Sequence, residues 1–280
     1  MRFCQNTAYC GRNAALNGKC RRSWITSRRK SYILRLPKKH GAAWDGRETG
    51  KMENAGRVEW REFWSRYARE AYDDVALLAE NRRLLARVCE LVGSRKRILD
   101  AGCGTGNLTV ELARNNRVTA IDFSPDMVAA CRRKAGGSRD VAVHIGDVTG
   151  LRLPGDSFDA VASVNVLFNL SKPKQALDEA HRVLKPGGIL VACSLLKGQG
   201  LTQAQLEQAR SEWKEQGLAP ERLERVLGFH NCLFESGGVK FTPTLDEMSG
   251  MLRQAGFDVL STEKVYFDAN FLVAARKAGT

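Results

Sequence analysis

The strongest chemical signal in the sequence is the run ILDAGCGTGN at 98–107, in which a short apolar segment leads into three glycines. Glycine lets the backbone turn tightly and approach a ligand closely. A helix that begins after such a loop offers unpaired N–H groups in its first turn. The run therefore predicts a strand, a ligand-binding loop and a helix, in that order.

The spacing and the charge of this loop discriminate between two classes of ligand. A dinucleotide-binding loop has the pattern GxGxxG, whereas here the third glycine comes one position early, at Gly106. Asp100 stands two residues before Gly102, where its carboxylate would repel a pyrophosphate and attract an ammonium group. The loop therefore favours a nucleoside with an amino-acid tail, and a nicotinamide oxidoreductase becomes a disfavoured alternative.

Two more aspartates follow predicted strands. Asp122 ends the segment 118–122, at a position where a carboxylate accepts hydrogen bonds from ribose hydroxyls in open parallel sheets. Asp147 follows the segment 141–145 and can accept a hydrogen bond from the exocyclic amine of a base. Each aspartate alone could be a turn or cap residue. With Asp100, however, they describe a ligand that carries an ammonium, a diol and an aromatic amine, which is S-adenosyl-L-methionine.

A general base helps methyl transfer when the acceptor is a hydroxyl or a cationic amine. The histidines of this chain offer no clear candidate for that base. The chain has four, at positions 40, 144, 181 and 230. We expect His144 to be structural and His181 to face solvent. His230 falls in a predicted loop, either as a base or substrate contact or as a histidine bonded locally. No catalytic residue is therefore assigned.

Strands and helices alternate along most of the chain. The predicted strands are 97–100, 118–122, 141–145, 158–164, 188–194, 257–264 and 271–276, and the helices between them are 108–114, 125–134, 174–184 and 245–255. Such alternation predicts an α/β, Rossmann-like fold, with a seven-stranded, mostly parallel sheet and helices on both faces. Few residues join the last two strands, so we expect them to form a C-terminal antiparallel hairpin.

A helical cap is predicted over 58–92. Trp60, Phe63, Trp64 and Tyr67 fall at i, i+3, i+4 and i+7 and therefore share one helix face. This stripe is either ordinary core packing or, through Tyr67 or Tyr72, a lid over the cofactor. An apolar, aromatic chamber of this kind favours a flat or lipophilic acceptor.

The segment 197–241 interrupts the alternation. It contains predicted helices at 202–216 and 220–227, followed by a glycine-containing loop around 228–238. Because it lies between a strand and the helix 245–255, we expect it to be an inserted lid that covers the acceptor.

The net charge of +13 on 280 residues belongs to one end of the chain. Residues 1–50 hold 12 Lys and Arg against 2 Asp and Glu, whereas the remainder holds 32 against 29. We therefore predict a basic, disordered tail over 1–51 and a folded domain over 52–280. The tail is interpreted either as a transit peptide or as sequence that precedes a start at Met52. The nearly balanced body does not indicate nucleic acid as a partner.

Cysteine usage and hydropathy exclude several other classes. None of the eight cysteines shows zinc-ligand spacing, so no metal site is expected. No apolar run approaches the length of a membrane span. We expect a cytoplasmic protein, or an organellar one if residues 1–51 are a transit peptide. The sequence does not indicate an oligomeric state.

The motifs together resemble those of class I S-adenosylmethionine-dependent methyltransferases of the small-molecule type (methyltransferase type 11/25-like). The matching runs are RILDAGCGTGNLTVELA, VTAIDFSPDMV, VHIGDV, FDAVASVNVLFNL and EAHRVLKPGGIL. The resemblance covers 58–195 strongly and 244–277 less strongly. It is specific for fold and cofactor but says little about the methyl acceptor.

The resemblance also implies roles for individual residues. In the glycine loop, it implies that Asp100, Gly102, Cys103, Gly104 and Asn107 hold the methionine part of the cofactor. It further implies that Asp122 holds the ribose, that Phe123 and Met127 flank the adenine, that Asp147 and the Val148 N–H read the adenine edge, and that Asn165 lines the cofactor side of the pocket.

The sequence departs from the family pattern after the fourth strand. Related sequences often place histidines there, whereas this chain has Phe168 and Asn169. The departure removes an easy candidate for a general base.

From the motifs and the resemblance together, we expect an enzyme that methylates a small molecule. The alternatives are an RNA or protein methyltransferase and a cofactor-binding protein without catalytic activity.

Overall fold

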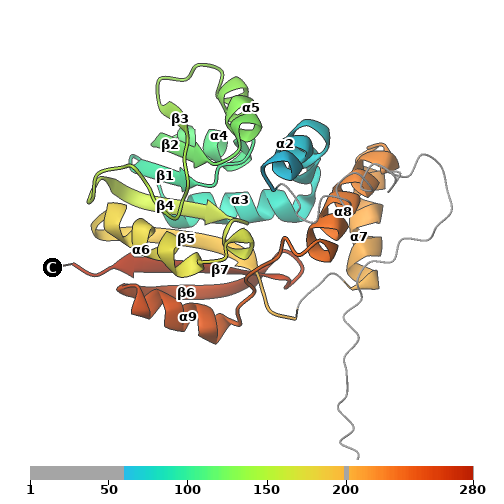
Figure 1. Cartoon of the computed structure of the whole chain (residues 1–280). Coiled ribbons are helices and arrows are strands. Elements are labelled where there is room, and N and C mark those ends of the chain that lie inside the picture. The colour runs from blue at the N-terminus through green and yellow to red at the C-terminus, as the bar shows by residue number, and fades with distance from the viewer. Residues whose placement is uncertain (1–59, 199–201, 280) are drawn as a thin grey trace, which may run out of the picture. The chain divides into compact units, whose positions relative to one another are not determined.

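The computed structural model describes residues 60–198 and 202–279, and these contain a seven-stranded sheet (Figure 1). The predicted tail over 1–51 lies outside the described residues. The strands are β1 (Arg97–Ala101), β2 (Arg117–Asp122), β3 (Val141–Ile145), β4 (Phe158–Val164), β5 (Leu184–Leu195), β6 (Phe257–Val265) and β7 (Asn270–Lys277). Their order across the sheet is β3-β2-β1-β4-β5-β7-β6. Strand β7 runs antiparallel to both β5 and β6, and the other described pairs are parallel, which confirms the predicted fold class and the C-terminal hairpin.

Helices cover both faces of this sheet, as its buried strands require. One face packs against α3 (Ala79–Val92), α4 (Asn107–Ala113) and α5 (Pro125–Ala135). The other face packs against α6 (Pro173–Val183) and α9 (Leu245–Gln254). Alternate residues of β1 serve the two cores, since Ile98 belongs to the first and Leu99 to the second. The sheet is thereby a rigid platform whose strand ends can position a site.

The strand order reverses between β1 and β4. The chain moves outward from β1 to β2 and β3, and then returns to place β4 on the other side of β1. In open α/β sheets, ligands bind beyond the carboxyl ends of the strands at such a switch point. The glycine loop follows β1 and Asn165 follows β4, so the fold brings these two segments to the same crevice.

The cap and the insert pack together above this edge. Of the cap predicted over 58–92, α3 packs on the sheet, and the name cap is kept for α2 (Trp60–Glu70) and the short 3₁₀ helix η1 (Tyr72–Leu77). The insert contains α7 (Gln203–Glu215) and α8 (Pro220–Glu235). Figure 1 shows α2 and α8 on the same side of the sheet. Phe63 and Tyr67 of α2 form one apolar cluster with Phe229 and Leu233 of α8.

Three local expectations were wrong. The helix predicted to end at Leu227 continues to Glu235, because Phe229 and Leu233 extend its apolar face onto α2. Strand β5 begins at Leu184 and not near Gly188. His181 does not face solvent, since its partly buried ring packs edge-on against Phe257 at 5.0 Å between ring centroids.

Within the described residues, no helix combines the length and the apolar character that a membrane span needs.

Candidate functional site

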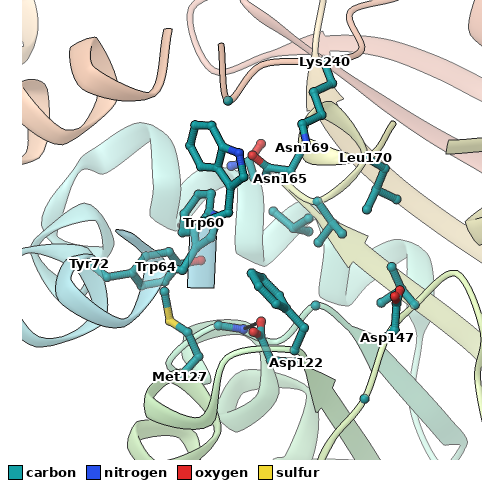
Figure 2. Close-up of a pocket in the computed structure, with 18 residues that line it drawn as sticks. Trp60, Trp64, Tyr72, Asp122, Met127, Asp147, Asn165, Asn169, Leu170 and Lys240 are labelled. Atoms are coloured by element: carbon teal, nitrogen blue, oxygen red, sulfur yellow. Dashed lines mark hydrogen bonds between the residues drawn. The ribbon is translucent and has the colours of Figure 1, made fainter. Parts of the chain in front are cut away.

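A cavity lies at the carboxyl edge of the sheet, beneath α2 and the segment that follows α8 (Figure 2). Its wall contains eight of the residues predicted to bind the cofactor: Gly102, Gly104, Asp122, Phe123, Met127, Asp147, Val148 and Asn165. Seven of them end or follow β1, β2, β3 or β4, and Met127 lies in the first turn of α5. The fold therefore brings together residues that are up to 63 positions apart in the sequence.

The glycine loop forms the floor of the cavity and has no room for side chains. Gly102 has a φ of +85°, and a Cβ placed there would lie 2.2 Å from Cγ2 of Val166. At Gly104 a Cβ would lie 2.7 Å from the Tyr72 hydroxyl. The amides of Gly102 and Cys103 both donate to the carbonyl of Ile121, at 2.8 and 2.9 Å. The loop is thus fixed against β2 with its backbone exposed to the cavity.

Asp122 joins the glycine loop to the start of α5. Its Oδ2 accepts from the Gly104 N–H at 2.9 Å, and its Oδ1 accepts from the Ser124 N–H at 2.9 Å. Ser124, and not Asp122, is the N-cap of α5, since its hydroxyl accepts from the amide of Met127. Burial raises the pKa of Asp122, which these backbone N–H groups partly offset. Each carboxylate oxygen keeps acceptor capacity for a ligand hydroxyl.

The side of the cavity beyond Asp122 is built from an exposed ring and a turn. Phe123 is 39% exposed and belongs to the cavity wall, so its ring is accessible to a ligand. Asp147 accepts from the N–H and the hydroxyl of Thr149, at 2.8 and 2.7 Å, which holds its turn after β3. Val148 is buried, and Figure 2 shows Asp122, Met127 and Asp147 along the same side.

Three predicted cofactor residues do not line the cavity. Asp100 is 1% exposed and points to the face covered by α4, where it accepts from the Thr109 hydroxyl at 2.6 Å. Burial raises the pKa of Asp100 to about 7. Cys103 packs among buried apolar residues under α5, and Asn107 accepts from Lys134 at 2.5 Å. A contact between these three residues and the cofactor stays a prediction.

The aromatic stripe of α2 divides between the cavity and the core. Trp60 and Trp64 line the cavity together with Tyr72 of η1. Tyr67 does not, because its ring stacks on Phe229 at 4.7 Å between centroids. Of the two tyrosines considered as a lid, the structure therefore places only Tyr72 at the site.

His230 lies on α8, away from the cavity wall. Its Nε2 is 3.1 Å from the Tyr67 hydroxyl, in a partly buried pair that connects the cap to the insert. Burial lowers the pKa of His230 to about 4. The alternative of a loop histidine bonded locally is wrong, because its partner is 163 residues away on another helix. The position of His230 also gives no support to a role as a base.

Sequence reasoning missed part of the wall opposite Asp122. Asn169 and Leu170 come from the end of η2 (Leu167–Asn169), and Gly238 and Lys240 come from the chain after α8. Asn169 had a sequence signal, because it stands where related sequences often carry histidine. Lys240 had none, since only tertiary structure brings it to this wall.

Comparisons with known proteins agree with this arrangement. Residues 99–192 match the family described as Methyltransferase domain. The chain is 30% identical over 222 residues to the demethylmenaquinone methyltransferase of Tropheryma whipplei strain Twist, covering 76% of this chain and 89% of that protein. It is 33% identical over 165 residues to the demethylmenaquinone methyltransferase of Clavibacter sepedonicus, covering 58% of this chain and 65% of that protein.

Solved structures support the fold. A SAM-dependent methyltransferase from Aquifex aeolicus has a TM-score of 0.52 at 20% identity, over 75% of this chain and 95% of that chain. The cyclase SpnF has a TM-score of 0.54 at 23% identity, over 76% of this chain and 84% of that chain. At such identities the likeness concerns architecture alone. The family follows from the sequence match across nearly the whole Tropheryma protein: this chain belongs to the class I S-adenosylmethionine-dependent methyltransferases.

Proposed function

We propose that this chain transfers a methyl group from S-adenosylmethionine to a small, planar, lipophilic acceptor in the described cavity. One observation carries the proposal: a single cavity has the predicted cofactor residues along one side and an apolar, aromatic wall along the other. Gly102, Asp122 and Asp147 represent the first side, and Trp60 and Leu170 represent the second (Figure 2). Methyl transfer needs both partners in one enclosed space.

The residues present fit the cofactor. The floor at Gly102 and Gly104 carries no side chain, so the backbone of the glycine loop itself faces the cavity. In our proposal the methionine part lies over this floor, the ribose hydroxyls donate to Asp122, and the adenine lies near Phe123 and Asp147. Bound S-adenosylmethionine supplies an electrophilic methyl group on a sulfonium. The protein's own task is to align the acceptor and to exclude water.

The character of the wall supports a small acceptor over a polyanion. Among the described residues of the cavity wall, Lys240 is the single Lys or Arg, and Asp122 and Asp147 are acidic. Nucleic acid recognition rests on several cationic contacts with phosphates. The names of the two relatives, demethylmenaquinone methyltransferases, further support a lipophilic ring as acceptor. We therefore propose a quinol-like small molecule in preference to RNA or protein.

The proposal is tested by following labelled methyl groups from S-adenosylmethionine into three fractions: chemically reduced demethylmenaquinone, total RNA and a protein extract. We expect label in the reduced demethylmenaquinone alone and none with a folded Asp122→Ala variant. Label in RNA or protein would replace the small-molecule acceptor by one of the two alternatives. S-adenosylhomocysteine binding without transfer to any fraction would contradict the proposed acceptor class but not cofactor binding.

A further inference from the structure

A buried polar atom of the cavity wall has no partner in the described part of the chain. It is Oδ1 of Asn169, on the 3₁₀ turn that follows β4. A carbonyl oxygen that is buried without a donor is destabilising, and most native proteins avoid one. Because Asn169 lines the cavity, a ligand could supply the missing donor. An O–H or N–H group on the acceptor has the required chemistry.

A cation lies in the same wall. The ammonium of Lys240 is 5.8 Å from the centre of the Trp60 ring, and within residues 60–198 and 202–279 no carboxylate forms an ion pair with it. The other ionisable groups of the wall are Asp122, Asp147 and Tyr72. Figure 2 shows Lys240 on the side of Asn165 and Asn169, with Asp122 and Asp147 across the cavity.

The main chain holds Lys240 and Asn169 next to each other. The amides of Lys240 and Phe241 both donate to the carbonyl of Phe168, at 2.7 and 3.1 Å. The Phe168 amide in turn donates to the buried hydroxyl of Ser194 at 3.0 Å. Two residues before Lys240, a Cβ at Gly238 would fall 2.5 Å from the Trp60 ring, so the chain is seated directly on the indole. The backbone therefore holds the two residues side by side at this wall.

We propose that Asn169 and Lys240 recognise the hydroxyl of an aromatic acceptor at this end of the cavity in both of its protonation states. The neutral hydroxyl donates to Oδ1 of Asn169, and the ionised hydroxyl is held by the ammonium of Lys240, with the aromatic ring beside Trp60. On ionisation, the hydroxyl proton passes to water and the electron pair stays on oxygen, which makes the ring and its oxygen more nucleophilic. This inference rests on the proposed function, because it assigns the residues that recognise the acceptor hydroxyl in the same site.

Opposite effects on ionisation distinguish the two residues. Lys240 stabilises the oxyanion and so lowers the pKa of a bound aromatic alcohol, whereas Asn169 stabilises the neutral form and so raises it. Lys240→Met removes the charge but keeps the apolar stem. Asn169→Leu replaces the unpaired amide by an apolar side chain of similar size, so we expect it to unfold at the same temperature as the wild type or higher. A purely structural role for the two residues would not produce shifts of opposite sign.

The test uses the full chain, saturated with S-adenosylhomocysteine, and 4-nitro-1-naphthol as the probe, whose ionised form absorbs visible light. Lys240→Met should raise the pKa of the bound probe by about one unit, a tenfold loss of affinity for the naphtholate. Asn169→Leu should lower that pKa and weaken binding of the neutral naphthol about tenfold. The matched control ligand, 1-methoxy-4-nitronaphthalene, should bind equally to all three proteins.

Several results would overturn the inference. One is a wild type that binds S-adenosylhomocysteine but not 4-nitro-1-naphthol. Another is the same pKa of the bound probe in all three proteins. A third is a variant that loses as much affinity for 1-methoxy-4-nitronaphthalene as for the naphthol. A fall in S-adenosylhomocysteine affinity in Lys240→Met would instead assign Lys240 to the cofactor. If the wild type bound no S-adenosylhomocysteine, the proposed function itself would fail, so the two failures are distinguishable.

Discussion

Replacing Gly102 by alanine perturbs the floor of the cavity at its tightest point. The residue has a φ of +85°, in the left-handed region, and a Cβ there would lie 2.2 Å from one methyl group of Val166. Two other atoms of Val166 would lie at 3.2 and 3.3 Å. Because the glycine loop and the end of β4 meet at the switch point of the sheet, neither side can move without moving a strand end.

The expected loss of stability has two parts. A left-handed conformation costs an alanine roughly 1–2 kcal/mol, and forced overpacking adds about 1–3 kcal/mol. Gly102→Ala should therefore lower the free energy of unfolding by about 2–5 kcal/mol. Gly136→Ala is the matched control, since Gly136 has a φ of +60° with nothing within 4 Å of a Cβ. It should show only the backbone part, about 1–2 kcal/mol.

Urea unfolding of both variants, together with Val166→Ala and the double variant, separates these parts. Removing the Val166 methyl groups should relieve the overlap, so the double variant should be more stable than additivity predicts, by about 1–3 kcal/mol. The reasoning would be refuted if Gly102→Ala were as mild as Gly136→Ala, or if Val166→Ala recovered nothing. Either result would mean that the loop and the end of β4 do not pack as described.

Further predictions concern pH and the ends of the chain. Burial raises the pKa of Asp100 from 3.8 to about 7, so the stability of the wild type falls as the pH rises through this window. Urea unfolding should show this fall as about 4 kcal/mol between pH 4 and 8 in the wild type, and Asp100→Asn should not show it. Burial lowers the pKa of His230 from 6.5 to about 4, so stability falls as pH drops through that window, and His230→Gln should remove about 3 kcal/mol of this fall. A chain that begins at Met52, our proposed domain boundary, should bind S-adenosylhomocysteine as tightly as the full chain in calorimetry. A tenfold lower affinity of the shortened chain would mean that residues 1–51 contribute to cofactor binding.

The elements of the sheet could be predicted because their signals are local. Strands 141–145 and 158–164 were predicted with the bounds that the structure gives them, since each is a short apolar run between turn residues. The glycine loop was predictable for a similar reason, because only glycine tolerates the positive φ at Gly102 without strain. The antiparallel hairpin followed from the short connection between the last two strands.

The wall opposite Asp122 could not be predicted because tertiary contacts create it. No pattern in the sequence relates Lys240 to Asn169, which meet through the Phe168 carbonyl. Likewise, α8 continues past Gly228 because its apolar residues find partners on α2, which overrides the helix-breaking tendency of glycine. The inward orientation of Asp100 also depends on which face of β1 it occupies, and hence on the packing of α4.

Calorimetric titration with S-adenosylhomocysteine, set beside NAD⁺, tests most directly the claim that this cavity holds the cofactor. The wild type should bind S-adenosylhomocysteine saturably and show no heat with NAD⁺. Asp122→Ala should bind at least about a hundredfold more weakly, because it loses two charge-assisted hydrogen bonds worth roughly 1.5–3 kcal/mol each. Asp122→Asn should lose less affinity. Circular dichroism must show that the variants are folded, since Asp122 also holds Gly104 and Ser124. A folded Asp122→Ala variant with unchanged affinity, or a wild type that binds NAD⁺ in place of S-adenosylhomocysteine, would contradict the claim.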